Sequence, residues 1–118
     1  KRVVSVEIFE DLHEAAAVKL RDKSIENVEL YVGDVMRGWQ PEQAHDVVVV
    51  TGSVPEIPEQ ILGWVNPGGR LFVVRGESPA MEACLMTRLD VTEWTVESLF
   101  ETDLPELEHA APEPEFEF

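Results

Sequence analysis

This 118-residue sequence has few lysines and arginines and a single cysteine. Nine lysines and arginines stand against 24 aspartates and glutamates, which gives a formal net charge of −15. A protein that binds the phosphate backbone needs clustered Lys and Arg, so the composition argues against a nucleic-acid partner. The same shortage disfavours an anionic membrane surface. A small ligand stays possible, because local geometry can override the net charge.

Cys84 is the only cysteine, so an internal disulfide is impossible. Its neighbours in the run ACLM are apolar, which indicates a buried, unreactive thiol rather than a nucleophile. A reducing compartment, the cytoplasm, fits this usage. Neither a signal peptide nor an apolar run of membrane-spanning length is present. Because the sequence opens without Met, directly on the strand pattern RVVSVE, we expect a piece of a longer protein.

Recognisable catalytic and metal-binding patterns are also missing. The three histidines, His13, His45 and His109, lack the spacing to Cys or to one another that metal ligands show, so no metal is expected. No Ser/His/Asp or Cys/His arrangement can be defended, so the catalytic residues stay unknown. A glycine-rich phosphate loop of the form G-x-G-x-x-G is absent, and PGGR precedes a strand rather than a helix.

The pattern of apolar residues predicts an α/β fold. Apolar, β-branched runs predict four strands, over residues 2–7, 28–34, 46–50 and 70–76. Helical spacing predicts helices over 10–24 and 58–65, and two alternating segments, 80–90 and 92–103, predict an antiparallel pair. This order implies a largely parallel, Rossmann-like sheet with right-handed crossovers and an antiparallel pair at its C-terminal side.

The last residues differ in composition from the rest of the sequence. We expect one domain over residues 1–107 and an acidic, proline-containing tail over 108–118. Phe116 and Phe118 are unusual in such a tail. They are expected to pack on their own domain, with docking to a basic partner as the other interpretation.

Small and acidic residues follow the predicted parallel strands, at the edge where ligands of open α/β sheets bind. Glu7 follows the first strand, and its carboxylate can accept both hydroxyls of a ribose diol. Asp34 follows the second and can accept a hydrogen bond from an amine such as that of adenine, while Gly33 lets a flat ring approach. Taken singly, Glu7 is equally a charge before a helix, and Gly33-Asp34 an ordinary turn. The run Thr51-Gly52-Ser53 follows the third strand.

Five segments spread over residues 1 to about 107 form a more specific combination. They are VVSVE, NVELYVGD followed by GW, HDVVVVTGSVPEIPEQIL, NPGGRLFVVRGE and ESLFETDLPEL. Together they resemble the protein-L-isoaspartate O-methyltransferases, which are class I methyltransferases that use S-adenosylmethionine (SAM). The joint presence of VTGSVPEIP, PGGRLFVVRGE and ESLFET is the most specific part of this resemblance.

The resemblance implies cofactor-binding and substrate-binding residues. Glu7 corresponds to the acid that binds the SAM ribose, and the run Gly33, Asp34 and Val35 corresponds to the segment at the adenine. Thr51 corresponds to a position at the methionine end of SAM. Thr51, Gly52 and Ser53 together correspond to the loop that borders the methyl-accepting substrate.

The implied partner is a protein or peptide with an isoaspartyl residue, methylated on its carboxylate as a step in protein repair. The family's first strand and glycine-rich SAM loop precede the point that matches Lys1, so the chain alone is expected to be inactive and to bind SAM weakly. Without that strand, either strand 2–7 pairs directly with 46–50 or the chain packs differently. Two other functions stay open: a noncatalytic interaction domain on this scaffold, and a class I methyltransferase of small molecules. Oligomeric state is not predictable.

Overall fold

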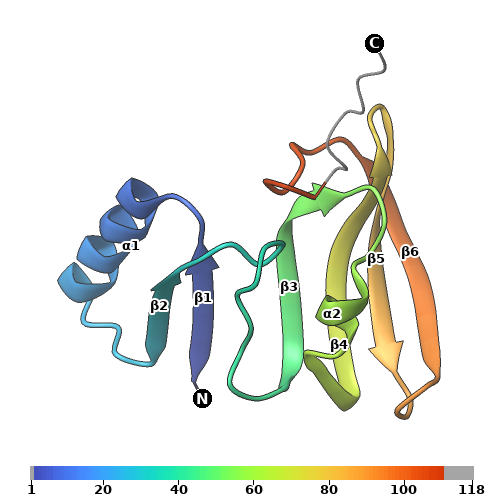
Figure 1. Ribbon diagram of the computed structural model, residues 1–118, viewed down its shortest axis with the longest axis horizontal. Coiled ribbons are helices and arrows are strands. Elements are labelled where there is room, and N and C mark those ends of the chain that lie inside the picture. Colours follow the sequence, from blue (N-terminus) through green and yellow to red (C-terminus); the bar gives the residue numbers. More distant parts are fainter. Residues whose placement is uncertain (1, 111–118) are drawn as a thin grey trace. The chain divides into compact units, whose positions relative to one another are not determined.

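The computed structural model describes residues 2–110, and the chain divides into two compact units, Lys1–Gln40 and Pro41–Phe118. The described strands form two sheets, one of two strands in the first unit and one of four strands in the second (Figure 1). Phe116 and Phe118 lie outside the described residues. The predicted boundary between residues 107 and 108 stays a prediction.

The first unit is a β–α–β arrangement, in which one helix connects two parallel strands that pair with each other. Strand β1 (Val3–Glu7) is followed by helix α1 (Glu10–Asp22) and strand β2 (Val28–Val32). The strands pair in parallel from Val3 opposite Val28 to Glu7 opposite Val32. All three predicted elements are therefore confirmed, with the helix and the second strand two residues shorter than predicted.

Charge at the ends of α1 agrees with the helix dipole. Glu10 and Asp11 lie in its first turn, and Lys19 and Arg21 in its last. Acidic groups near the N-terminus and basic groups near the C-terminus each stabilise a helix by about 0.3–1 kcal/mol. This contribution matters here because no residue of α1 is buried.

The second unit contains four strands and one short helix. They are β3 (His45–Val54), α2 (Glu59–Leu62), β4 (Val65–Glu77), β5 (Ala80–Arg88) and β6 (Trp94–Thr102), with the strands in sequential order in the sheet. β3 and β4 are parallel, while β4–β5 and β5–β6 are antiparallel. The predicted α/β class and the antiparallel C-terminal pair are confirmed.

Two predicted strand boundaries and the length of the predicted helix in this unit were wrong. β3 does not end at Val50 but continues to Val54, and β4 begins at Val65 rather than at residue 70. Both extensions contain irregularities in the β3–β4 register, after His45 and after Val49. Gly68 has a φ of +85°, a conformation that suits glycine. The second helix is shorter than the predicted 58–65.

The two expected alternatives for strand 2–7 differ in its pairing partner. Among the described strands, β1 pairs with β2, and β3 pairs with β4. The parallel register of β1 with β2 satisfies the backbone groups on one side of β1.

The core lies in the second unit, mainly on one face of the four-stranded sheet. Helix α2 lies over β4 on this face (Figure 1). The main cluster of buried residues is Val50, Val54, Ile61, Val65, Leu71, Val73, Cys84 and Met86. Trp64 and Trp94 pack against this cluster. A smaller cluster on Val74, Met81 and Ala83 has Phe72 packed against it.

Cys84 is buried, as predicted, and belongs to a polar contact across three strands. Burial raises the pKa of its thiol, and a 3.4 Å hydrogen bond to Glu82 Oε1 acts in the same direction. Arg75 donates to the same carboxylate oxygen from Nη2 at 3.0 Å, and Ser98 donates to Oε2 at 3.0 Å. These hydrogen bonds, that of Arg75 first, lower the pKa of Glu82. Cys84 is thus held as a neutral thiol, without the features of a nucleophile.

Arg88, at the end of β5, donates hydrogen bonds to three parts of the second unit. Its Nη1 donates to the carbonyls of Val65 at 2.6 Å and Leu62 at 3.4 Å. Its Nε and Nη2 donate to the carbonyls of Asp90 and Val91, at 3.1 and 2.7 Å. The guanidinium carbon lies 5.6 Å from the centroid of the Trp94 ring. One side chain thereby links the end of α2, the start of β4 and the β5–β6 turn.

Replacing Arg88 with lysine is expected to lower the free energy of unfolding by about 2 kcal/mol. An ammonium group keeps the charge but lacks the planar set of five donors, so carbonyls that Arg88 now satisfies lose their partners. Urea unfolding of R88K and wild type measures this difference. Arg70→Lys, at an exposed arginine of β4, is the matched control and should change stability by less than about 0.5 kcal/mol. Equal losses in both variants would contradict the linking role.

Candidate functional site

The carboxyl ends of β1 and β2 bring Glu7 and Gly33 together. Glu7 is opposite Val32 in the parallel pair, and the Gly33 amide donates to the Glu7 carbonyl at 3.0 Å. The Glu7 carboxylate is half-buried and accepts from the Phe9 amide at Oε1, at 3.2 Å. No residue of the described chain donates to Oε2. The acid predicted for ribose binding therefore lies at the strand edge with acceptor capacity remaining.

Asp34 closes the turn that follows β2. Its Oδ1 accepts from the Met36 amide at 2.9 Å, and its carbonyl accepts from the amides of Arg37 and Trp39 at 3.0 and 3.1 Å. This is the ordinary use of an aspartate at a turn. Val35 lies in the same turn and is half-buried. The turn fixes the backbone of Gly33, Asp34 and Val35 next to the end of β1.

Trp39 lies against Gly33. A methyl group added at Gly33 would be 2.6 Å from Trp39 Cδ1, a distance that side chains essentially never show. The Trp39 ring also lies 6.2 Å from the Tyr31 ring, at an interplanar angle of 52°. Gly33 therefore permits an aromatic ring of the chain itself, that of Trp39, to approach the backbone. The GW dipeptide at 38–39 was the available signal. The expected approach of an adenine ring stays a prediction.

The run Thr51-Gly52-Ser53 lies inside β3, at an irregularity of the strand. Between Val49 and Ser53 the β3 chain advances four residues while β4 advances two, from Phe72 to Val74. This is the arrangement of a β-bulge, which redirects side chains and is common near functional sites. Thr51 is exposed, Gly52 half-buried and Ser53 fully buried. The three residues predicted to border a substrate thus have three different environments.

The chain after β6 returns to this bulge, which the sequence did not predict. The Ser53 amide donates to the Pro105 carbonyl at 3.0 Å, and the Leu107 amide donates to the Ser53 carbonyl at 2.8 Å. Together they form a short parallel bridge between Ser53 and Glu106. Figure 1 shows the red segment after β6 reaching the carboxyl end of β3. No local pattern could reveal this contact between residues so far apart in sequence.

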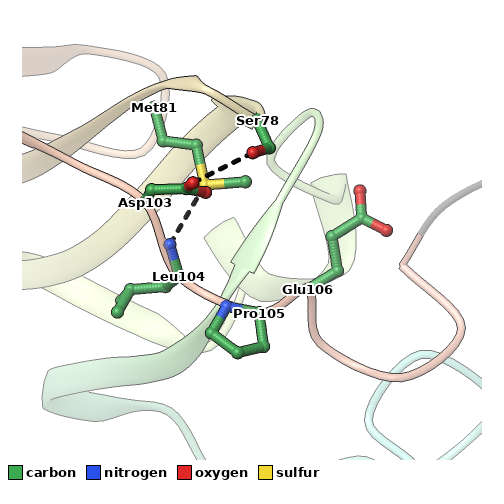
Figure 2. Close-up of a pocket in the computed structure, with 6 residues that line it drawn as sticks. All are labelled: Ser78, Met81, Asp103, Leu104, Pro105 and Glu106. Atoms are coloured by element: carbon green, nitrogen blue, oxygen red, sulfur yellow. Dashed lines mark hydrogen bonds between the residues drawn. The ribbon is translucent and has the colours of Figure 1, made fainter.

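An open pocket lies beside the returning segment, at the β4–β5 turn (Figure 2). It is lined by Ser78, Met81, Asp103, Leu104, Pro105 and Glu106. Ser78 Oγ donates to Asp103 Oδ2 at 3.0 Å, and the Leu104 amide donates to the Met81 sulfur at 3.4 Å. The lining has two carboxylates and no basic side chain, so it suits a neutral or cationic group.

The predicted site residues are therefore found in two groups. Glu7 and the run 33–35 lie together in the first unit, and the run 51–53 lies in the second, against residues 104–107. Within residues 2–110, no group of His, Cys, Asp and Glu is arranged to hold a metal ion. None of the described helices is long and apolar enough to cross a membrane.

Substituting Gly33 with alanine is expected to displace the Trp39 ring. The added methyl would overlap Cδ1, and such overpacking costs about 1–3 kcal/mol. Near-ultraviolet circular dichroism, which reports the environment of aromatic rings, should change, and the midpoint of thermal unfolding should fall. Gly63→Ala is the matched control, because its methyl would meet only the Gln60 carbonyl at 3.4 Å. A G33A spectrum identical to wild type would show that the ring does not lie there.

Comparison with known proteins finds similarity to protein-L-isoaspartate O-methyltransferases along most of the chain. Residues 1–99 match the family model described as protein-L-isoaspartate(D-aspartate) O-methyltransferase (PCMT). A protein-L-isoaspartate O-methyltransferase of Brucella anthropi is 31% identical over 99 residues, which are 83% of this chain and 46% of that protein. One of Methanoculleus marisnigri is 37% identical over 75 residues, 64% of this chain and 34% of that protein.

Solved structures agree with the sequence comparisons. A protein-L-isoaspartate O-methyltransferase structure has a TM-score of 0.77 at 29% identity, over 89% of this chain and 33% of that one. A Plasmodium falciparum protein, provisionally described as a protein-L-isoaspartate O-methyltransferase and crystallised with S-adenosyl-L-homocysteine, has a TM-score of 0.77. It is 17% identical and covers 91% of this chain and 52% of that one, so it supports the fold alone.

The similarity extends over most of this chain but over only part of each relative. The chain spans less than half the length of the Brucella and Methanoculleus relatives. The family model, by contrast, matches most of this chain, and the predicted resemblance and the methyltransferase fold are confirmed. The chain belongs to the protein-L-isoaspartate(D-aspartate) O-methyltransferase family.

Proposed function

We propose that the chain is the C-terminal part of a SAM-dependent protein carboxyl methyltransferase that methylates isoaspartyl residues, a step in protein repair. The observation that carries the proposal is the joint position of Glu7 and Gly33-Asp34 at the carboxyl edge of two parallel strands. Family membership adds the reaction class. A cytoplasmic location belongs to the same proposal and is supported by the single, buried cysteine.

The chemistry of the donors and acceptors in the first unit fits an adenosine compound. Glu7 Oε2 has no donor among the described residues, so the carboxylate retains capacity for the hydroxyls of a vicinal diol. Glu7 is the last residue of β1, and Asp34 lies in the turn that follows the neighbouring strand β2.

The role of the chain in methyl transfer is to bind SAM and the methyl acceptor and to orient them. When bound, SAM would supply an electrophilic methyl group for a substrate carboxylate oxygen, giving a methyl ester and leaving S-adenosyl-L-homocysteine. A carboxylate is already ionised near pH 7, so the chain needs no general base for this reaction. Glu7 and the run 33–35 would hold the adenosine end. Thr51, exposed at the β3 bulge, would border the acceptor, and positioning of this kind is the main source of rate.

Substitution of Glu7 with glutamine tests the proposal in the protein expressed from its complete reading frame. The amide keeps the size of the carboxylate but loses charge-assisted acceptance from the ribose hydroxyls, so affinity for S-adenosyl-L-homocysteine should fall about tenfold. Isothermal calorimetry measures the affinity. Wild type should also methylate an isoaspartyl peptide and leave the matching aspartyl peptide unmodified.

Glu29→Gln is the control for this substitution. Glu29 lies near the amino end of β2, away from the carboxyl ends of the strands, where it pairs with Arg2 at 3.0 Å and accepts from Tyr31 Oη at 3.0 Å. E29Q should bind S-adenosyl-L-homocysteine as wild type does. Unchanged affinity in E7Q, or equal discrimination by wild type between the two peptides, would contradict the proposal.

A further inference from the structure

The segment Leu104–Leu107, which we call the return segment, pairs with β3 at Ser53, the residue at which the β3–β4 register resumes opposite Val74. Register with β4 is interrupted between Val49 and Ser53. The Ser53 amide donates to the Pro105 carbonyl, and the Leu107 amide donates to the Ser53 carbonyl. Both backbone groups of Ser53 are thereby bonded to the return segment. An irregular strand that would otherwise be weakly held acquires a fixed conformation.

The side chain of Ser53 makes a third bond to the same segment. Its Oγ donates to the Leu104 carbonyl at 3.0 Å, across 51 residues of sequence. The residue is 0% exposed. A buried hydroxyl whose proton is already donated within the chain is not available to a substrate that approaches from solvent. Its effect on the site has to be transmitted through the return segment.

Gly52 allows this close approach. A Cβ at Gly52 would lie 3.0 Å from both the Cα and the amide nitrogen of Leu107. The Leu107 side chain in turn packs against the main core cluster. Backbone meets backbone at this point, so neither side can move aside as a flexible side chain would. Gly52 and Ser53 face the return segment, while Thr51 is exposed.

We propose that Ser53 is a positioning residue, which acts with Gly52 through the return segment to hold the bulge that presents Thr51 to the methyl acceptor. This inference rests on the proposed function. It changes the role expected of Ser53 from substrate contact to orientation. A looser bulge should weaken binding of the acceptor peptide and should leave the adenosine-binding residues of the first unit unaffected.

The test uses two substitutions in the protein expressed from its complete reading frame. Ser53→Ala removes the bond to Leu104, and Gly52→Ala forces the return segment away from β3. For each variant, KM and kcat for an isoaspartyl peptide, affinity for S-adenosyl-L-homocysteine, and hydrogen exchange at the Leu107 amide are measured. The Leu107 amide reports the return segment directly, because its acceptor is the Ser53 carbonyl.

Two matched controls separate positioning from general loss of stability. Ser98→Ala also removes a serine hydroxyl bond from the same sheet, the one to Glu82, and Gly63→Ala also adds a methyl group, at a site with room for it. Neither residue contacts the return segment. Both controls should retain wild-type KM and wild-type protection at Leu107.

S53A is expected to raise KM about three- to tenfold, the range that corresponds to loss of one hydrogen bond. G52A should raise it further. In both, Leu107 should exchange faster, kcat should change less, and affinity for S-adenosyl-L-homocysteine should stay at the wild-type value. A raised KM with unchanged Leu107 exchange would indicate direct substrate contact and overturn the inference, as would faster exchange with unchanged KM. Wild type without methyl transfer would instead overturn the proposed function and the inference that rests on it.

Discussion

Ser53 is the residue on which the carboxyl edge of the second unit depends. It is fully buried, and its amide, carbonyl and hydroxyl are all bonded to residues 104–107. Unpaired polar groups in such a place would cost about 1–3 kcal/mol each, so the strand can be buried here only if the chain after β6 returns. The end of the sheet and the end of the described chain therefore stabilise each other.

This dependence connects the fold to its proposed chemistry. A parallel sheet places the carboxyl ends of its strands along one edge, where turns and bulges are free to vary. In the first unit, that edge holds Glu7 beside Gly33 and Asp34, with Trp39 packed on the glycine. In the second, the edge holds a bulge in which only Thr51 is exposed. The residues of the first unit suit an adenosine ligand. The bulge of the second unit suits a surface that borders the methyl acceptor.

Local patterns were sufficient to predict most elements. Alternation along 80–90 and 92–103 predicted β5 and β6, because side-chain direction in a strand repeats every two residues. The spacing in 10–24 predicted α1, and the apolar neighbours of Cys84 predicted its burial. The rule for parallel strands also placed Glu7 next to Gly33 correctly.

The errors occurred where distant contacts decide the structure. The predicted end of the third strand at Val50 came from Thr51, Gly52 and Ser53, which are small and polar and break the apolar pattern. Those residues remain in the strand because residues 104–107 supply hydrogen-bond partners for them. The residues near them in sequence do not predict these partners. The predicted start of the fourth strand at residue 70 was wrong for the same reason, since β4 already pairs with β3 at Val65.

The bonding of residues 104–107 to Ser53 can be observed directly by nuclear magnetic resonance on the chain. Scalar coupling across a hydrogen bond links an amide nitrogen to the carbonyl carbon of its acceptor. The structure predicts such a coupling between the Leu107 amide and the Ser53 carbonyl, as for the backbone bonds between β4 and β5. If the β4–β5 couplings are detected and the Leu107–Ser53 coupling is absent, the return of the chain to β3 is wrong.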